Sequence, residues 1–237
     1  MSFSPILISL KTASLAILIT FILGIFTAYI VVSIKSKGLK MVIDGILTMP
    51  LVLPPTVIGF MLLAIFGVNR PIGRLLLDFL GVKIVFSWTA TVIAAIVISF
   101  PLMYRAARGA FEQVDETLIM AARTIGLNEW KIFWKIMMPL ALPGVLSGGI
   151  LSFARGLGEF GATAMIAGNI AGKTQTLPMA IYSEVAAGNM ETARGYVWVV
   201  LTLSFFVVVS MNYFSVKRFD KSKSNASERL MEGEEWA

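Results

Sequence analysis

The chain alternates between long apolar runs and short polar segments. Charged side chains are scarce in five of these runs, which are residues 12–34, 42–66, 84–103, 141–167 and 197–214. An α-helix rises ~1.5 Å per residue, so about 20 apolar residues are enough to cross a bilayer. The pattern therefore predicts an all-α integral membrane protein with about five transmembrane helices.

The same pattern predicts several local features. Three prolines, Pro50, Pro54 and Pro55, should kink the second span, because proline lacks an N–H and clashes with the preceding turn. We expect residues 67–83 to form a loop. Residues 177–187 are apolar but too short to cross, which indicates an interfacial or re-entrant segment.

One polar segment, between the third and fourth spans, has the signals of a helical hairpin. Asp115 can cap a first helix, and Gly126 can end it in a left-handed turn. Asn128 can cap a second helix, which Pro139 would close. The hairpin is thus expected between two spans, on one side of the membrane.

The second helix of this hairpin is expected to have an aromatic face. Trp130, Phe133, Trp134 and Met137 fall at spacings of three and four, so they share one side of a helix. Such a face could dock on a cytoplasmic protein or lie on lipid headgroups. Periodicity alone leaves both interpretations open.

Positive charge predicts the orientation. Thirteen of the twenty Lys and Arg residues lie in segments predicted to be cytoplasmic, six lie outside, and Arg155 lies within a span. This bias places the N-terminus outside and the hairpin and C-terminus in the cytoplasm. Residues 10–214 then form a transmembrane domain, and residues 215–237 form a charged cytoplasmic tail.

Composition excludes several classes of function. Only 14% of residues are charged, and the chain has no Cys and no His, so disulfides and zinc sites are excluded. No nucleophile–base pair or metal cluster is apparent, so we expect neither catalytic nor metal-binding residues. The basic residues flank the spans instead of forming a stripe, which argues against nucleic-acid binding.

A near-match to a phosphate-binding loop occurs at residues 168–174, GNIAGKT. The motif needs four residues between its glycines, but Gly168 and Gly172 enclose three, and Ala167 stands where the first glycine should be. The segment also follows a predicted helix instead of a strand. We therefore expect this chain to bind no ATP or other cofactor, so that energy must come from a partner.

Polar residues within the fourth span are candidates for an intramembrane site. Arg155 lies near the midpoint of residues 141–167 and needs a partner there, for which Glu159, one turn later, is suitable. Ser152 and Gly156 fall on the same face. The pair could fix the register of the helix or take part in gating. Small residues four apart indicate close packing, within the subunit or at a subunit seam: Gly144, Gly148, Ser152 and Gly156.

The hairpin resembles a cytoplasmic loop in permease subunits of ABC importers, which reads E-A-A-x-x-x-G, nine residues, then I-x-L-P. Two positions of this sequence depart from that pattern, with Met120 in place of Glu and Met138 in place of Leu. The resemblance implies that the loop docks on an ATPase. The implied coupling residues are Met120, Ala121, Ala122, Gly126, Trp130, Phe133, Ile136 and Pro139.

Three further runs resemble molybdate permeases and their sulfate relatives. These are P-L-V-L-P-P at 50–55, A-R-G-L-G-E-F-G-A-T at 154–163 and T-L-P-M-A-I-Y at 176–182. The resemblance implies the ABC type-1 importer permease fold and a tetrahedral oxyanion substrate. The compact length and the last run favour molybdate, with sulfate, thiosulfate or tungstate as alternatives.

The resemblance also implies an assembly in a bacterial or archaeal cytoplasmic membrane. Two copies of this chain would form the pathway, two ABC ATPase subunits would carry ATP and Mg²⁺, and an extracytoplasmic binding protein would deliver the oxyanion. The chain would then be no enzyme itself. A passive anion channel is an alternative of another class, and the docking loop argues against it because a channel needs no ATPase.

Overall fold

The computed structural model describes residues 2–210 and residue 213, and within this part of the chain it contains helices and no strands. The predicted all-α class is therefore confirmed, while the predicted tail 215–237 lies outside the described residues. The helices in chain order are α1 (Ser4–Val32), α2 (Lys37–Val52), α3 (Pro55–Phe66), α4 (Pro71–Leu80), α5 (Trp88–Glu112), α6 (Glu116–Thr124), α7 (Glu129–Ile132), the π-helical turn η1 (Phe133–Met137), α8 (Met138–Leu157), α9 (Gly161–Ala167), α10 (Leu177–Ala186) and the last helix, Met190–Ser210.

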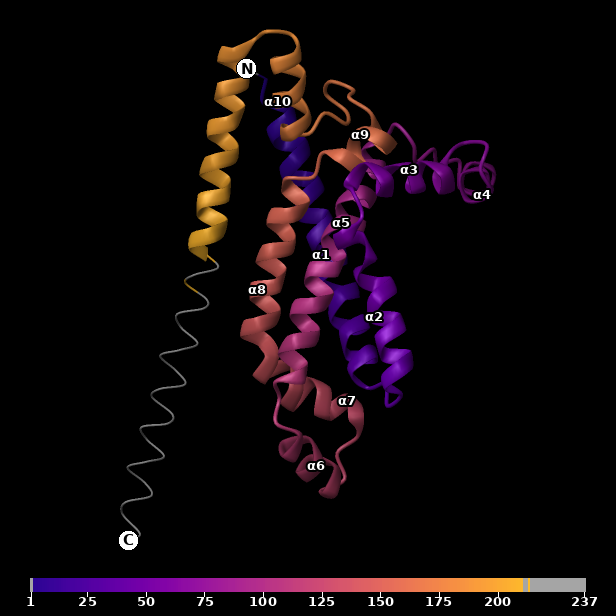
Figure 1. Cartoon of the computed structure of the whole chain (residues 1–237), viewed down its shortest axis with the longest axis vertical. Coiled ribbons are helices and arrows are strands. Elements are labelled where there is room, and N and C mark those ends of the chain that lie inside the picture. Colours follow the sequence, from indigo (N-terminus) through magenta and orange to yellow (C-terminus); the bar gives the residue numbers. More distant parts are fainter. Residues whose placement is uncertain (1, 211–212, 214–237) are drawn as a thin grey trace.

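Four of these segments are long and apolar enough to cross a membrane: α1, α5, the continuous stretch Glu129–Leu157 and Met190–Ser210. The bent pair α2 and α3 gives a fifth span if it is counted as one, as predicted. Figure 1 shows α1, α2, α5, α8 and the last helix running roughly along the long axis, with α6 and α7 at one end and the N-terminus near the other. We call these the hairpin end and the opposite end.

The core of the bundle lies between α1, α5 and α8, where small residues let the helices approach closely. A Cβ atom on Gly24 would lie 2.6 Å from Met103 Cγ, and one on Gly148 would lie 2.3 Å from Ala106 Cβ. Buried hydroxyls also join α1 to α5, since Thr12 Oγ1 lies 3.0 Å from Thr91 Oγ1. The glycine stripe of α8 thus packs within the subunit, which was the simpler of the two predicted uses.

The second span bends far more sharply than the predicted kink. Helices α2 and α3 are bent by 109° at a break between Val52 and Pro55. Consecutive prolines at 54 and 55 cannot continue the hydrogen-bond pattern of α2. Helix α3 therefore turns across the bundle and packs on α9, where a Cβ on Gly59 would lie 2.7 Å from Ala162 Cα.

The loop predicted over residues 67–83 is wrong, because α4 occupies most of it. Pro71 stands at the start of α4, where its missing N–H is harmless, and Gly81 ends it with a left-handed φ of 63°. The stretch between the spans therefore contains both helix signals, a proline at its start and a glycine at its end.

The predicted fourth span, residues 141–167, is also wrong at both ends. Pro139 does not close the preceding helix, because the π-turn η1 changes the hydrogen-bond register just before it: the Met138 N–H donates to the Phe133 carbonyl. The helix then continues and ends at Leu157. A break at 158–160 separates it from α9, so Arg155 lies in the last turn of α8 and not at a midpoint.

Helix α10 has ten residues, which confirms that this segment is too short to cross. It lies at the opposite end against α1, where the Leu177 N–H donates to Ser9 Oγ at 2.7 Å. The side chains of Leu177 and Ala180 are buried there. The last helix is fixed to the same end through Tyr196, whose hydroxyl donates to the Ser2 carbonyl at 3.1 Å.

Candidate functional site

The predicted hairpin is present, and we call residues 115–137 the coupling hairpin. Asp115 Oδ1 accepts from the Thr117 N–H at 2.9 Å, and Asn128 Oδ1 accepts from the Lys131 N–H at 2.8 Å. The hydrogen bond from Thr117 holds the pKa of the Asp115 carboxyl below its usual value. Both predicted caps are confirmed.

Gly126 makes the turn between the two arms of the coupling hairpin. Its φ is +80°, a left-handed conformation that glycine adopts without the penalty borne by other residues. No neighbouring atom would contact a Cβ at this position. A substitution here would therefore act through the backbone and not through a clash.

A bidentate ion pair joins the two arms, and sequence reasoning missed it. Arg123 Nε lies 2.7 Å from Glu129 Oε1, and its Nη2 lies 3.1 Å from Oε2. The hydrogen bond to Glu129 raises the pKa of Arg123. Opposite charges three residues before and three residues after Gly126 were the signal that could have found it.

The aromatic face is divided between two roles instead of forming one docking surface. Phe133 is fully buried, with its ring centroid 4.5 Å from that of Tyr29 and 5.7 Å from that of Phe111. Trp130 stacks on Phe26 with an interplanar angle of 7° but remains more than half exposed. The inner aromatics therefore fix the coupling hairpin to α1 and α5.

The outer surface of the coupling hairpin carries large apolar side chains among its charged residues. Exposed large side chains occur on both arms, and Met120, which stands where the resembled pattern has Glu, is one of them. Among the predicted coupling residues, five are exposed, Ile136 is partly buried, and Ala122 and Phe133 are buried. The exposed apolar residues are Leu118, Met120, Ile125, Trp130 and Trp134.

The predicted Arg155–Glu159 pair forms at the break between α8 and α9. Arg155 Nη1 lies 2.9 Å from Glu159 Oε2, and Glu159 Oε1 accepts from the Ala162 N–H at 2.7 Å. The Glu159 side chain is 2% exposed and that of Arg155 is 33% exposed. One carboxylate thus holds the end of α8 to the first turn of α9.

Of the other residues predicted beside this pair, Gly156 faces α5. A Cβ on Gly156 would lie 3.8 Å from Ala95 Cβ and 4.0 Å from Ser99. Ser152 is buried, and its hydroxyl has no hydrogen-bond partner among the described residues. Ser152 therefore lies inside the subunit, and the exposed polar group of this cluster is Arg155.

A polar network between α2 and α5 was not predicted. Arg108 forms an ion pair with Asp44, which also accepts from the Tyr104 hydroxyl at 2.9 Å. Glu112 lies 3.0 Å from Arg108 and 2.8 Å from Lys40 Nζ. Helix α2 has no fully buried residue, and this network joins it to α5 beside the partly buried Ile43 and Leu47, which pack on the same core. The i, i+4 spacing of Arg108 and Glu112 was a usable signal.

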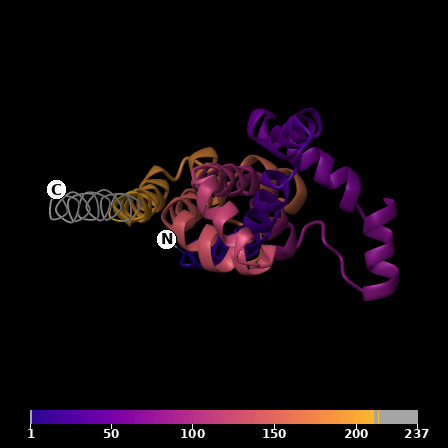
Figure 2. The ribbon, with the colours of Figure 1, turned by 90° about the horizontal axis from the view of Figure 1, so that it is seen from below.

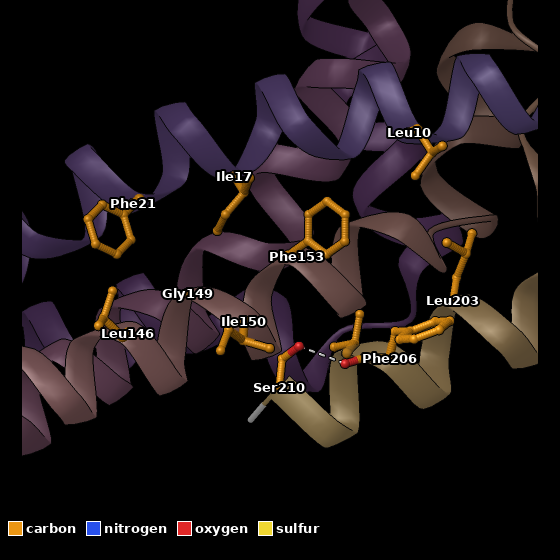
Figure 3. A pocket seen from close by; sticks show the side chains of 11 residues that line it. Leu10, Ile17, Phe21, Leu146, Gly149, Ile150, Phe153, Leu203, Phe206 and Ser210 are labelled. Carbon is orange, nitrogen blue, oxygen red and sulfur yellow. Dashed lines mark hydrogen bonds between the residues drawn. The ribbon is translucent and has the colours of Figure 1, made fainter. Parts of the chain in front are cut away.

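A groove of about 480 Å³ lies between α1, α8 and the last helix, and Figure 3 shows its lining side chains from all three. Its walls are apolar apart from Ser210, whose hydroxyl donates to the Phe206 carbonyl at 2.8 Å. Among the residues that the structure describes, no charged side chain lines the groove. It therefore lacks the groups that would hold an oxyanion.

Comparison with known proteins agrees with this architecture. The structure matches a bacterial ABC transporter that imports alginate, with a TM-score of 0.71 and 16% identity, covering 92% of this chain and 80% of that chain. It also matches the MetNI methionine ABC transporter, with a TM-score of 0.64 and 17% identity, covering 89% and 94%. The fold is that of an ABC type-1 importer permease.

Sequence relatives are closer. The molybdenum transport system permease protein ModB of Escherichia coli K12 is 47% identical over 191 residues, covering 80% of this chain and 83% of that protein. ModB of Haemophilus influenzae Rd is 44% identical over 196 residues, covering 82% and 85%. The family of binding-protein-dependent transport system inner membrane components matches residues 20–224. With its apolar spans and coupling hairpin, the chain belongs to this family and is a multi-pass inner-membrane transport component.

Proposed function

We propose that this chain is the permease subunit of an ABC importer for a tetrahedral oxyanion, and that the oxyanion is molybdate. The observation that carries the proposal is the 47% identity to a molybdenum transport permease over most of both chains. Sulfate, thiosulfate and tungstate are the alternatives within the same class, because they share tetrahedral geometry and negative charge with molybdate.

The assembly that we propose has two copies of this chain at its centre. A homodimer would cover faces that a single copy leaves open, such as α2 and the exposed side of Met190–Ser210. Two ATPase subunits, which hold ATP and Mg²⁺, dock at the hairpin end. A binding protein delivers the oxyanion at the opposite end, a partner of the kind present in the solved alginate transporter.

The orientation that we propose places the N-terminus outside and the coupling hairpin in the cytoplasm. Residues 10–214 form the transmembrane domain and residues 215–237 a cytoplasmic tail. The bias of Lys and Arg supports this arrangement, and so does the placement of the N-terminus and the hairpin at opposite ends. ATP hydrolysis belongs to the partner, and this chain is no enzyme.

Coupling depends on a hairpin that is packed against α1 and α5 on its inner side and exposes large apolar side chains on its outer side. The buried Phe133 and the stacked Trp130 transmit a push on the hairpin to α1 and α5. Met120 and Ile125 offer exposed apolar surface to the ATPase. ATP binding on the partner would turn the pathway outward, and hydrolysis would reset it.

The Arg155–Glu159 pair holds the α8–α9 joint in register, and a gating role is the second candidate. Its position at the break supports the first role, because Glu159 bonds both sides of the joint. Direct oxyanion binding is disfavoured, since Glu159 offsets the charge of Arg155. Ser152 completes the cluster as a buried neighbour.

The test is uptake of labelled molybdate into proteoliposomes that contain this chain with its ATPase and binding protein. Unlabelled molybdate, tungstate and sulfate compete separately at equal concentrations. Competition by molybdate that is much stronger than competition by sulfate supports the proposal. Stronger competition by sulfate would instead indicate a sulfate permease. Uptake that does not depend on ATP would favour a passive anion channel.

A further inference from the structure

Helix α4 has three distinct sides. One side meets the end of α3, where a Cβ on Gly73 would lie 2.4 Å from the Phe66 carbonyl oxygen. A second side carries Ile72, Leu75 and Phe79 at the i, i+3, i+7 spacing of a helical stripe. These side chains are 48%, 56% and 82% exposed, so nothing in the described chain covers them.

The third side of α4 is charged. Arg74 Nε lies 3.6 Å from Asp78 Oδ2, and the two side chains are 75% and 60% exposed. At about 100° per residue, Arg74 lies about 140° around the helix from Phe79, and Asp78 lies between Arg74 and the apolar stripe. Arg70 precedes the helix as its N-cap. Lys83 follows shortly after the helix. Basic residues therefore outnumber acidic ones around a helix whose opposite side is apolar.

The placement of α4 fits a membrane surface. Figures 1 and 2 show α3 and α4 running across the long axis of the bundle at the end away from the coupling hairpin. Helix α3 contains no charged residue, whereas α4 begins just after the polar pair Asn69 and Arg70. The chain thus changes from apolar in α3 to amphipathic in α4, within the arm that runs across the spans.

A second feature marks the same end of the bundle. The Lys11 ammonium lies 4.4 Å from the centre of the Trp88 ring, at the start of α5. Tryptophan and lysine are enriched at the boundary between lipid tails and headgroups. A helix with a charged side, an apolar side and an axis across the spans has the properties of a helix lying in this boundary.

We propose that α4 lies in the lipid–water interface of the leaflet opposite the coupling hairpin. Ile72, Leu75 and Phe79 enter the upper acyl region, and Arg70 and Arg74 contact lipid phosphates. The helix anchors the arm formed by α3 and α4 against the membrane. This inference depends on the chain spanning a bilayer and not on which oxyanion is carried.

The experiment uses single cysteines in a chain that has none of its own. Nitroxide spin labels are attached at Leu75→Cys and Phe79→Cys, with Arg74→Cys as the matched control on the polar side. The complete complex with its ATPase is reconstituted in liposomes. Collision rates of the label with oxygen, which enters lipid, and with a water-soluble nickel chelate are then compared.

We expect the ratio of oxygen to nickel collisions to be several-fold higher at positions 75 and 79 than at position 74. Nickel collisions dominating at 75 and 79 would place the apolar side in water and overturn the proposal. Low collision rates with both reagents would mean that protein, a second copy or a binding protein, covers this side, which would also overturn it. Transport measured on the same vesicles separates this result from any failure of the proposed function.

Discussion

Two of the Arg–Glu pairs in the molecule have the same chemistry but lie in opposite settings. Arg123 and Glu129 join the arms of the coupling hairpin with side chains 52% and 58% exposed. Arg155 and Glu159 join α8 to α9 at the opposite end, with Glu159 almost completely buried. Exposed pairs contribute little because water and salt screen them, whereas a buried charge that loses its partner is costly.

The comparison shows that the two joints are held by different forces. The coupling hairpin has caps at Asp115 and Asn128 and the left-handed Gly126, so its shape follows from local backbone preferences. The α8–α9 joint has no side-chain cap from its N-cap residue Phe160. Glu159 alone supplies the acceptor and the counter-charge there, which makes this joint the more sensitive of the two.

The largest effect should come from Glu159→Gln. The amide can still accept from Ala162, but Arg155 loses its counter-charge. Removing one partner of a buried pair costs about 3–5 kcal/mol, and we expect the lower part of this range because Arg155 is partly exposed. The melting temperature of the purified permease and the rate of transport in proteoliposomes would both fall.

Two controls sharpen this test. Glu191→Gln makes the same chemical change at an exposed position and should leave melting and transport unchanged. The double variant Arg155→Gln, Glu159→Gln should recover part of the loss. Losses that simply add in the double variant would show that the two residues act separately.

A smaller loss of stability but a strong loss of coupling should follow from Gly126→Val. A side chain at φ +80° is strained by roughly 1 kcal/mol or more, and β-branching worsens the fit. The arms of the hairpin would shift, so the ATPase should dissociate or hydrolyse ATP without transport. Gly38→Val is the matched control, since Gly38 lacks a positive φ and has equal room for a side chain. Normal transport by the Gly126→Val variant would show that coupling does not depend on the shape of the hairpin.

Breaking the exposed pair should have a still smaller effect. Arg123→Gln and Glu129→Gln remove a contact that water screens, while the caps and Gly126 remain. We expect the melting temperature to change little and any loss of ATPase binding to shrink at high salt. A loss as large as that of Glu159→Gln would show that burial does not distinguish the two joints.

Single cysteine substitutions should have the smallest effect on activity. They report on which side of the membrane each region lies. Lys37 begins α2 and Ala121 lies in α6, near the hairpin end, whereas Arg74 lies in α4 and Lys173 lies between α9 and α10, away from the hairpin. An impermeant thiol reagent added to intact cells should label only the second pair. Labelling of position 121 from outside would reverse the proposed orientation.

Local signals explain what could be predicted from the sequence. Caps act within three residues, so Asp115, Asn128 and Gly126 revealed the hairpin. The spacing of four residues predicted the Arg155–Glu159 pair. The predicted position of Arg155 at the midpoint of a span is wrong, because Arg155 lies in the last turn of α8. The apolar runs gave about five spans because length and hydropathy alone decide that feature.

Tertiary packing explains what could not be predicted. Hydropathy does not reveal the break at 158–160, because the segments on both sides of it are apolar. The break is accommodated by the packing of α9 on α3. The burial of Phe133 depends on Tyr29 and Phe111, which are distant in sequence. The network around Asp44 likewise needs the α2–α5 contact.

The most direct test of the central claim is whether molybdate accumulates in proteoliposomes against its gradient. The vesicles contain this chain, its ATPase and its binding protein, with ATP supplied on the side of the coupling hairpin. We predict accumulation that requires all three proteins and ATP, and none with the Gly126→Val chain. Molybdate that equilibrates through this chain alone, without ATP, would contradict the account and identify a passive channel.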